Sequence, residues 1–144
     1  MSAPSGSGGS RKPAILRPAE LPAADRGGGN KTIPLVTDKI GSKQFLNGIT
    51  SIAPGAAIAL HTHNCEESVL VIDGPAIVEF DGVDQPLETF DAVWCPPNVP
   101  HRFKNPSTEK PLRIFWTYAS IDATRTLVAT GETHSIGSEH AARR

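Results

Sequence analysis

Proline and glycine residues divide this chain into apolar segments that are too short to form long helices. The sequence holds 13 prolines and 13 glycines among 144 residues, and proline alone is nearly twice as frequent as its usual ~5%. Between them lie short runs rich in β-branched and aromatic residues, such as 68–72 and 112–118. Such runs, bounded by turn-forming residues, are typical of β-strands. The chain is therefore expected to fold into short strands joined by turns.

Strands are expected at regular spacing through the middle of the chain. The pair Asp81-Gly82 is typical of a tight hairpin turn between two of them. No segment shows the periodicity of a helix of ~12 residues. The expected strands comprise residues 44–52, 56–63, 68–72, 76–80, 85–90, 92–95, 101–105, 112–118 and 124–129. This succession predicts a single-domain, all-β sandwich or barrel.

The two ends of the chain differ in composition from the middle. Residues 1–34 are dominated by Ser, Gly, Pro and Ala, so we expect a disordered or extended N-terminal arm there. The β-barrel domain is expected over residues 35–130. A flexible, polar C-terminal tail is expected over residues 131–144.

Charge and hydropathy argue against two classes of partner. The formal net charge is −1, whereas a protein that binds nucleic acid normally carries a basic excess. No apolar run approaches the ~18 residues of a membrane-spanning helix, and no secretory signal is visible. Two cysteines are too few for a disulfide scaffold. We expect a cytoplasmic protein with free thiols and a small-molecule substrate, and neither nucleic acid nor a membrane as partner.

Three of the five histidines fall on or beside expected strands. His61 and His63 are two residues apart, so a strand points both side chains to the same face. Glu67 follows four residues later, and His101 lies on a later strand. Imidazole and carboxylate groups together form an ordinary ligand set for divalent transition metals. A His-x-His pair alone often lies on the protein surface. The spacing of the residues around it therefore decides whether it indicates a metal site.

That spacing resembles the first motif of the cupin family. The motif G-x5-H-x-H-x3-4-E-x6-G is matched at every position by Gly55, His61, His63, Glu67 and Gly74. Glu66 is a rival for Glu67, but neighbouring strand residues point to opposite faces. The motif therefore favours Glu67 as the carboxylate of the site.

The second cupin motif, G-x5-P-x-G-x2-H-x3-N, is matched in part. Pro96, His101 and Asn105 stand at the proper spacing, but Phe90 and Asn98 occupy the two glycine positions. Asn tolerates the left-handed backbone that a turn glycine supplies, whereas Phe90 indicates a turn that is built differently. Asn105 is expected to have a structural role.

The resemblance covers about residues 45–118 and implies a jelly-roll β-barrel around one divalent transition metal ion. The ligands that it implies are His61, His63, Glu67 and His101. Fe(II) is the favoured ion, and Mn, Ni, Co, Cu or Zn are alternatives. With four protein ligands an octahedral ion keeps open positions for substrate or O₂, whereas a tetrahedral zinc site would be closed and structural.

The resemblance also implies pairing of two copies through sheet faces and exchanged N-terminal strands, so we expect a homodimer. Apolar residues such as Leu70, Ile72 and Ile77 would lie on strand faces that need cover.

Further residues are candidates for the substrate site. Periodicity does not decide which face of 112–118 turns inward, the one with Ile114, Trp116 and Tyr118 or the one with Arg113, Phe115 and Thr117. The expected pocket walls are Phe103, Trp116, Val69 and Val78. No base is obvious, and Tyr118 and Glu66 are weak catalytic candidates. Cys65 could bind a soft metal, although a small packed thiol is the simpler interpretation for both Cys65 and Cys95.

Three functions fit this site. The favoured one is a mononuclear Fe(II)-type dioxygenase that acts on a small carbonyl- or hydroxyl-bearing substrate chelated to the metal. A redox-neutral isomerase, decarboxylase, lyase or cyclase is the first alternative, with the metal as a Lewis acid. A non-catalytic module that binds a small ligand is the second. Fold does not decide between them, because one fold hosts unrelated chemistries.

Overall fold

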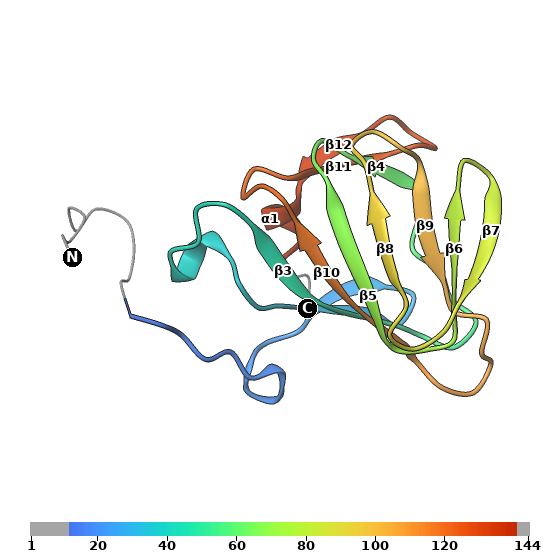
Figure 1. The fold of residues 1–144 in the computed structure, drawn as a ribbon, viewed down its shortest axis with the longest axis horizontal. Coiled ribbons are helices and arrows are strands. Elements are labelled where there is room, and N and C mark those ends of the chain that lie inside the picture. Colours follow the sequence, from blue (N-terminus) through green and yellow to red (C-terminus); the bar gives the residue numbers. More distant parts are fainter. Residues whose placement is uncertain (1–11, 141–144) are drawn as a thin grey trace.

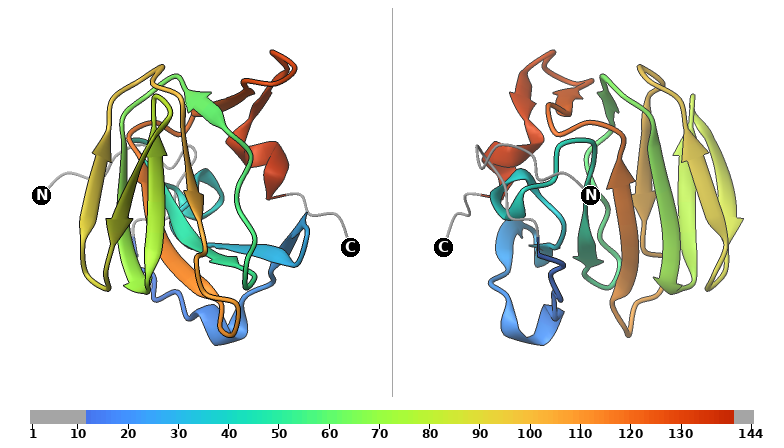
Figure 2. Two further views of the ribbon diagram at one scale, coloured as in Figure 1. Left: turned by 90° about the vertical axis from the view of Figure 1, so that its right-hand side faces the viewer. Right: turned by 60° about the vertical axis from the view of Figure 1, so that its left-hand side comes forward.

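Two antiparallel six-stranded sheets face each other in the computed structural model, which describes residues 12–140 (Figures 1 and 2). The strand order is β1-β2-β3-β10-β5-β8 in the first sheet and β12-β11-β4-β9-β6-β7 in the second. The strands are β1 (Ala24–Gly27), β2 (Asn30–Pro34), β3 (Leu46–Ile52), β4 (His61–His63), β5 (Glu67–Asp73), β6 (Ala76–Phe80), β7 (Val83–Leu87), β8 (Ala92–Cys95), β9 (His101–Lys104), β10 (Leu112–Tyr118), β11 (Thr124–Leu127) and β12 (Thr133–Ser135). The prediction of an all-β fold is confirmed.

Helical structure is limited to short pieces in the described part of the chain. These are the four-residue helix α1 (Ile136–Glu139) and the 3₁₀ turns η1 (Pro18–Glu20) and η2 (Asp38–Ile40). None of the described helices is long and apolar enough to cross a membrane.

Side-chain alternation along β10 settles the choice that periodicity left open. Ile114, Trp116 and Tyr118 are each at most 4% exposed and belong to the hydrophobic core. Trp116 packs over Gly48 of the neighbouring strand β3, where an added Cβ would lie 2.5 Å from the indole ring. Its Nε1 donates to Thr50 Oγ1 at 2.8 Å. This close approach explains why a glycine interrupts β3.

The N-terminal arm differs from its expected form, because residues 24–34 are part of the first sheet. β2 pairs with β3 in antiparallel register, and β1 pairs with β2. The polar residues that made this segment look unstructured are buried and bonded. Thr32 Oγ1 lies 2.9 Å from Thr50 Oγ1, and Asn30 Nδ2 donates to Ala57 O. Residues 1–11 lie outside the described part.

The C-terminal tail also differs from its expectation over residues 133–139. β12 pairs with β11, and α1 follows with Ser135 as its N-cap. Ile136, only 1% exposed, joins the hydrophobic core. One apolar side chain and a capping serine therefore anchor a segment whose composition is otherwise polar. Residues 141–144 lie outside the described part.

Both replaced glycine positions of the second motif adopt left-handed backbone. Asn98 has φ 65° and Phe90 has φ 75°. The expectation of a differently built turn at Phe90 is therefore wrong in its backbone conformation. The phenyl ring is 76% exposed, so it meets no packing constraint.

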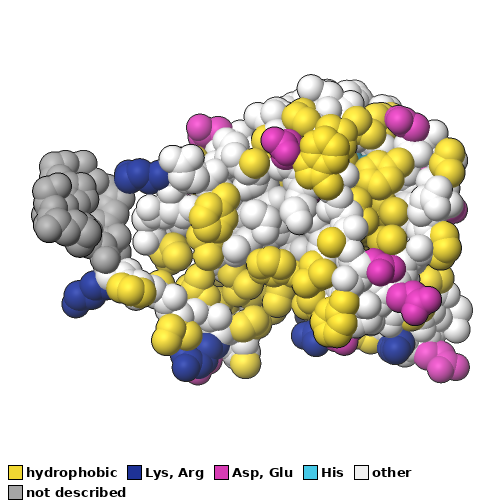
Figure 3. All heavy atoms as spheres, viewed as in Figure 1, with side chains coloured by type: hydrophobic (Ala, Val, Ile, Leu, Met, Phe, Trp, Pro, Cys, Tyr) yellow, Lys and Arg dark blue, Asp and Glu magenta, His cyan; other side chains and the backbone are white. Residues whose placement is uncertain are grey.

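Hydrophobic side chains gather on the outer face of the first sheet, among polar ones (Figure 3). Leu70 and Ile72 on β5 are half-buried there, and Trp94 on the edge strand β8 is 61% exposed. Pairing of two copies through a sheet face stays a prediction.

Asn105 ties the barrel together, as its expected structural role requires. Its buried Nδ2 donates to the carbonyls of Ile52, Ala53 and Lys110 at 2.9–3.2 Å, and its Oδ1 accepts from Ser107 N.

The Asn105→Ala variant should lose about 2–4 kcal/mol of unfolding free energy in urea titrations, because buried polar groups are left without partners.

Asn64→Ala is the matched control for that prediction. Asn64 bridges Asp122 O and Thr124 N, but at an exposed position where water replaces it. We expect its loss to cost at most about 1 kcal/mol. Equal destabilisation by the two variants would contradict the structural role of Asn105.

Candidate metal centre

Four polar side chains converge inside the barrel from three strands. His61 and His63 lie on β4, Glu67 begins β5, and His101 begins β9, directly opposite His61 in register. One ring nitrogen of each histidine lies within 4.8 Å of the others. Glu67 Oε1 lies 3.0 Å from His101 Nε2 and 3.4 Å from His63 Nε2. All four residues predicted from the sequence are buried and adjacent.

Backbone carbonyls orient the three imidazoles. The Nδ1 atoms of His61, His63 and His101 lie 2.6, 2.9 and 2.9 Å from the carbonyl oxygens of Ala59, Thr124 and Val99, respectively. A carbonyl oxygen can only accept, so each Nδ1 carries a proton and donates it. In a neutral ring, Nε2 then presents its lone pair to the centre. This is the arrangement in which histidine binds metals.

The site fits a divalent transition metal ion. His63 Nε2 is a buried polar atom with no hydrogen-bond partner among the described residues, although such atoms are normally satisfied. Three imidazole nitrogens and one carboxylate oxygen are a donor set suited to Fe, Mn, Co, Ni, Cu or Zn. These four residues could therefore hold such an ion.

Burial and nearby charges shift the pKa values of the residues at the centre. Burial, together with the positive charge of Arg125, places the pKa of His61 well below its usual value. Burial opposes ionisation of Glu67, but the hydrogen bond with His101 and the close contact with His63 hold its pKa far below the usual range. Burial also disfavours the charged form of His101, yet contacts with the Cys95 sulfur and the Glu67 carboxylate raise its pKa to about 10. Without metal, Glu67 and His101 form an ion pair.

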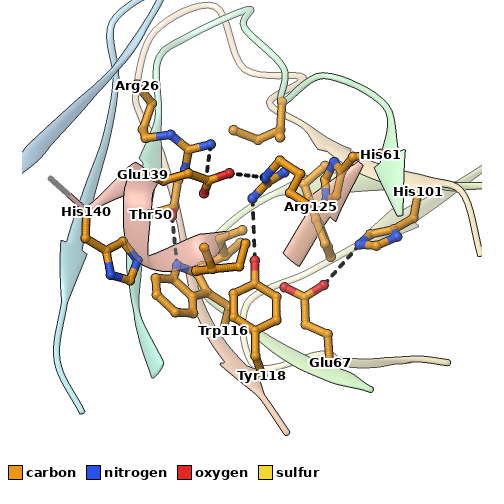
Figure 4. A pocket seen from close by; sticks show the side chains of 14 residues that line it. Arg26, Thr50, His61, Glu67, His101, Trp116, Tyr118, Arg125, Glu139 and His140 are labelled. Carbon is orange, nitrogen blue, oxygen red and sulfur yellow. Dashed lines mark hydrogen bonds and ion pairs between the residues drawn. The ribbon is translucent and has the colours of Figure 1, made fainter. Parts of the chain in front are cut away.

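A small cavity of about 30 Å³ adjoins the centre (Figure 4). Phe103 and Trp116 line it, as predicted. Val69 and Val78, which were also expected as pocket walls, belong to the packed core and do not line this cavity. Val69 lies opposite Trp116 and Val78 opposite Phe103 in strand register. The larger aromatic side chain of each pair supplies the wall.

Tyr118 lines the cavity beside the metal centre and retains its proton. Burial, with the Glu67 charge nearby, raises the pKa of the Tyr118 hydroxyl well above its usual value. Arg125 Nη2 donates to Tyr118 Oη at 3.4 Å, and none of the described residues accepts the tyrosine proton. This hydroxyl can therefore donate a hydrogen bond into the cavity.

Glu66 and the cysteines stand outside the ligand set. Glu66 is exposed and its carboxylate accepts a hydrogen bond from Trp94 Nε1 at 2.7 Å, so the structure does not bring this catalytic candidate into the cavity. Strand alternation turns it outward where Glu67 turns inward. Cys65 is half-buried and free, and burial raises its pKa. Cys95 is buried and free, with its Sγ 3.3 Å from His101 Nδ1.

Sequence reasoning missed the charged side of the cavity. Arg26, Arg125, Glu139 and His140 all line it, from segments that were assigned to the arm, an edge strand or the tail. The only local signal was Arg125 between Thr124 and Thr126, where strand alternation separates it from both neighbours. A charged residue normally turns to solvent, so this alternation predicted that Arg125 points outward, whereas its side chain points into the cavity.

Comparisons with known proteins agree with this architecture. Residues 48–118 match the family model described as Cupin domain. The chain is 30% identical to "Polyketide synthase CurC" of Streptomyces cyaneus over 106 residues, 72% of this chain and 68% of that protein.

Two solved structures resemble the fold. The polyketide cyclase RemF of Streptomyces resistomycificus aligns with a TM-score of 0.71 at 14% identity, covering 87% of this chain and 86% of that one. Salicylate 1,2-dioxygenase of Pseudoaminobacter salicylatoxidans aligns with a TM-score of 0.59 at 18% identity, over 67% of this chain but only 26% of that one. Identities this low show the fold alone, which supports the expected jelly roll.

The raised pKa of His101 predicts how the stability of the metal-free protein depends on pH. A folded-state pKa of about 10, against an unfolded value of ~6.5, gives stability that is complete below pH ~6.5 and is lost as pH rises through the folded value. After treatment with a chelator, the melting temperature should fall between pH 6.5 and 10. The His101→Gln variant, which lacks this titration, should show a flatter profile, and parallel profiles would contradict the ion pair.

Proposed function

Since this chain belongs to the cupin family, we propose that His61, His63, Glu67 and His101 hold a divalent transition metal ion and that the protein is a metal-dependent enzyme. The observation that carries the proposal is the orientation of the three imidazoles. Each Nδ1 is tied to a backbone carbonyl, so each Nε2 is directed to one centre, and that of His63 has no hydrogen-bond partner among the described residues. Burial of a polar atom without a hydrogen bond costs free energy. If the cluster were only structural, nothing would offset this cost at His63 Nε2.

We propose redox-neutral chemistry on a substrate with neighbouring carbonyl groups, of the type that closes a ring through an enolate. When bound, the ion supplies Lewis acidity toward a substrate oxygen. The names of the relative CurC and the structural neighbour RemF support this class. The cavity supports it as well, because a neutral hydroxyl and a guanidinium lie side by side there, and such donors stabilise negative charge that develops on oxygen.

The residues of the cavity have separable roles in this proposal. The substrate carbon gives its proton to solvent when the enolate forms; Tyr118 Oη then delivers a proton to the alkoxide as the carbon–carbon bond forms, and solvent restores the tyrosine proton. Arg125 Nη2, 3.4 Å away, stabilises the negative charge that the phenol oxygen then acquires. Phe103 and Trp116 keep water from the reacting carbon atoms and present flat apolar surfaces. The substrate would have an apolar body and one polar, chelating end.

A second candidate is the Fe(II)-type dioxygenase. The four side-chain donors leave positions free on an octahedral ion, and a dioxygenase shares the fold. The substrate would again bind through a carbonyl or hydroxyl group. A non-catalytic ligand-binding module is the third reading of the same site.

Metal content tests the ligand assignment. The His101→Ala and Glu67→Ala variants, purified without added metal, should retain less than about a tenth of the wild-type content by elemental analysis, because removing a ligand or its support costs 10–100-fold in affinity. His134→Ala, a histidine outside the cluster, is the control and should retain its metal. Unchanged metal in His101→Ala would contradict the assignment.

Turnover with and without O₂ separates the candidate reactions. A linear 1,3,5-triketone with a terminal carboxylate should be consumed under nitrogen as fast as in air, and Tyr118→Phe should lower kcat by about 10²-fold. Thr130→Val, which removes an exposed hydroxyl in a turn, should leave kcat unchanged. Consumption only in air, with O₂ uptake, would favour the dioxygenase. Binding without turnover under either condition would favour the ligand-binding module.

A further inference from the structure

A layer of charged side chains separates two cavities at one end of the barrel. The inner cavity of about 30 Å³ contains Glu67 and His101, and an outer groove has a volume of about 740 Å³. Arg26, Arg125 and Glu139 line both. They therefore form the wall between the metal centre and the large groove.

Two guanidinium groups and one imidazole hold Glu139 at both of its carboxylate oxygen atoms. Its Oε2 lies 2.6 Å from Arg125 Nε and 2.7 Å from His134 Nε2, and its Oε1 lies 3.3 Å from Arg26 Nη2. The side chains of Arg125 and Glu139 are only 7% and 6% exposed. Figure 4 shows Arg125 between Glu139 on one side and Tyr118 on the other. A buried carboxylate thus occupies a site formed by two guanidinium groups.

The inner cavity is too small for an organic substrate. A cavity of about 30 Å³ has room for one or two water molecules, whereas organic ligands occupy pockets of about 300–1,000 Å³. The outer groove is of that size. The two spaces share Arg26, Arg125 and Glu139 in their linings, so displacement of these side chains would join them into one pocket large enough for an organic substrate.

We propose that Arg125 and Arg26 form a binding site for a substrate carboxylate, and that Glu139 fills this site until the substrate replaces it. The inference rests on the proposed function for the second, metal-directed end of that substrate. Guanidinium groups bind carboxylates through paired hydrogen bonds, and Glu139 demonstrates that the site accepts this group. Its removal would otherwise leave a buried cation unpaired, which is unfavourable.

The position of Glu139 couples recognition to opening. Glu139 ends α1, and the next residue, His140, stacks on Trp116 with ring centroids 5.7 Å apart. Both Trp116 and His140 line the inner cavity. When a substrate carboxylate displaces Glu139, the end of α1 is released from Arg125, and the inner cavity can extend into the groove. The site then selects anionic substrates over neutral ones of the same shape.

Benzoate and its neutral isostere benzamide test this proposal on the full, metal-loaded chain by calorimetric titration. Glu139→Gln removes the competing charge and should tighten benzoate binding at least tenfold while changing benzamide binding less than twofold. Arg125→Lys should weaken benzoate binding at least tenfold, because an ammonium group cannot form the paired contact. Equal changes for both probes, or unchanged benzoate affinity in Glu139→Gln, would overturn the proposal.

Hydrogen exchange provides a measurement on the wild-type protein that needs no variant. Benzoate should accelerate amide exchange in residues 133–140, and benzamide should not. Absence of acceleration at saturating benzoate would overturn the displacement of Glu139. Binding of benzoate and benzamide requires no turnover. These two measurements therefore test the carboxylate site even if the protein does not catalyse the proposed reaction. Conversely, failure of the carboxylate site leaves metal content and triketone turnover unaffected.

Discussion

The hydrogen bonds from three imidazole Nδ1 atoms to backbone carbonyls are the constraint on which the centre of this protein depends. The carbonyls belong to Ala59, Val99 and Thr124, which lie just before β4, just before β9 and at the start of β11. β4 pairs with both β9 and β11, so the sheet that supplies the histidines also supplies the groups that orient them. The barrel fold therefore positions both the histidines and the carbonyls that orient them.

Charge alternates from the centre to the rim of the cavity. The Glu67 carboxylate meets the imidazoles, the Tyr118 hydroxyl meets Arg125, and Arg125 meets Glu139. Each buried charge has an opposite partner, which is the condition under which buried charges are tolerated. The arrangement also accounts for the direction of the pKa shifts, since the same guanidinium that faces Glu139 helps to lower the pKa of His61. Arg125 thus connects the charged wall of the cavity to the titration of the histidine cluster.

Local sequence could predict the strands in the middle of the chain and the four donors, because both depend on spacing. Residues 76–80, 92–95 and 112–118 are strands with the predicted bounds, and Glu67, not Glu66, turns inward as the motif implied. The rest depends on contacts between distant segments. Arg125 and Glu139 are 14 residues apart, and Arg26 reaches them from the N-terminal hairpin. No helix or strand periodicity connects residues this far apart, and their charges predicted that they would be exposed to solvent. Burial of Asn30 and Thr32 was hidden for the same reason.

The central claim is that three imidazoles and one carboxylate surround a single metal ion. X-ray absorption at the metal edge of the purified, metal-loaded protein measures this directly. We expect the metal ion to be surrounded by nitrogen and oxygen ligands, with the multiple-scattering signature of three imidazole rings. A shell with fewer than two imidazoles, or with sulfur from Cys65 or Cys95, would contradict it.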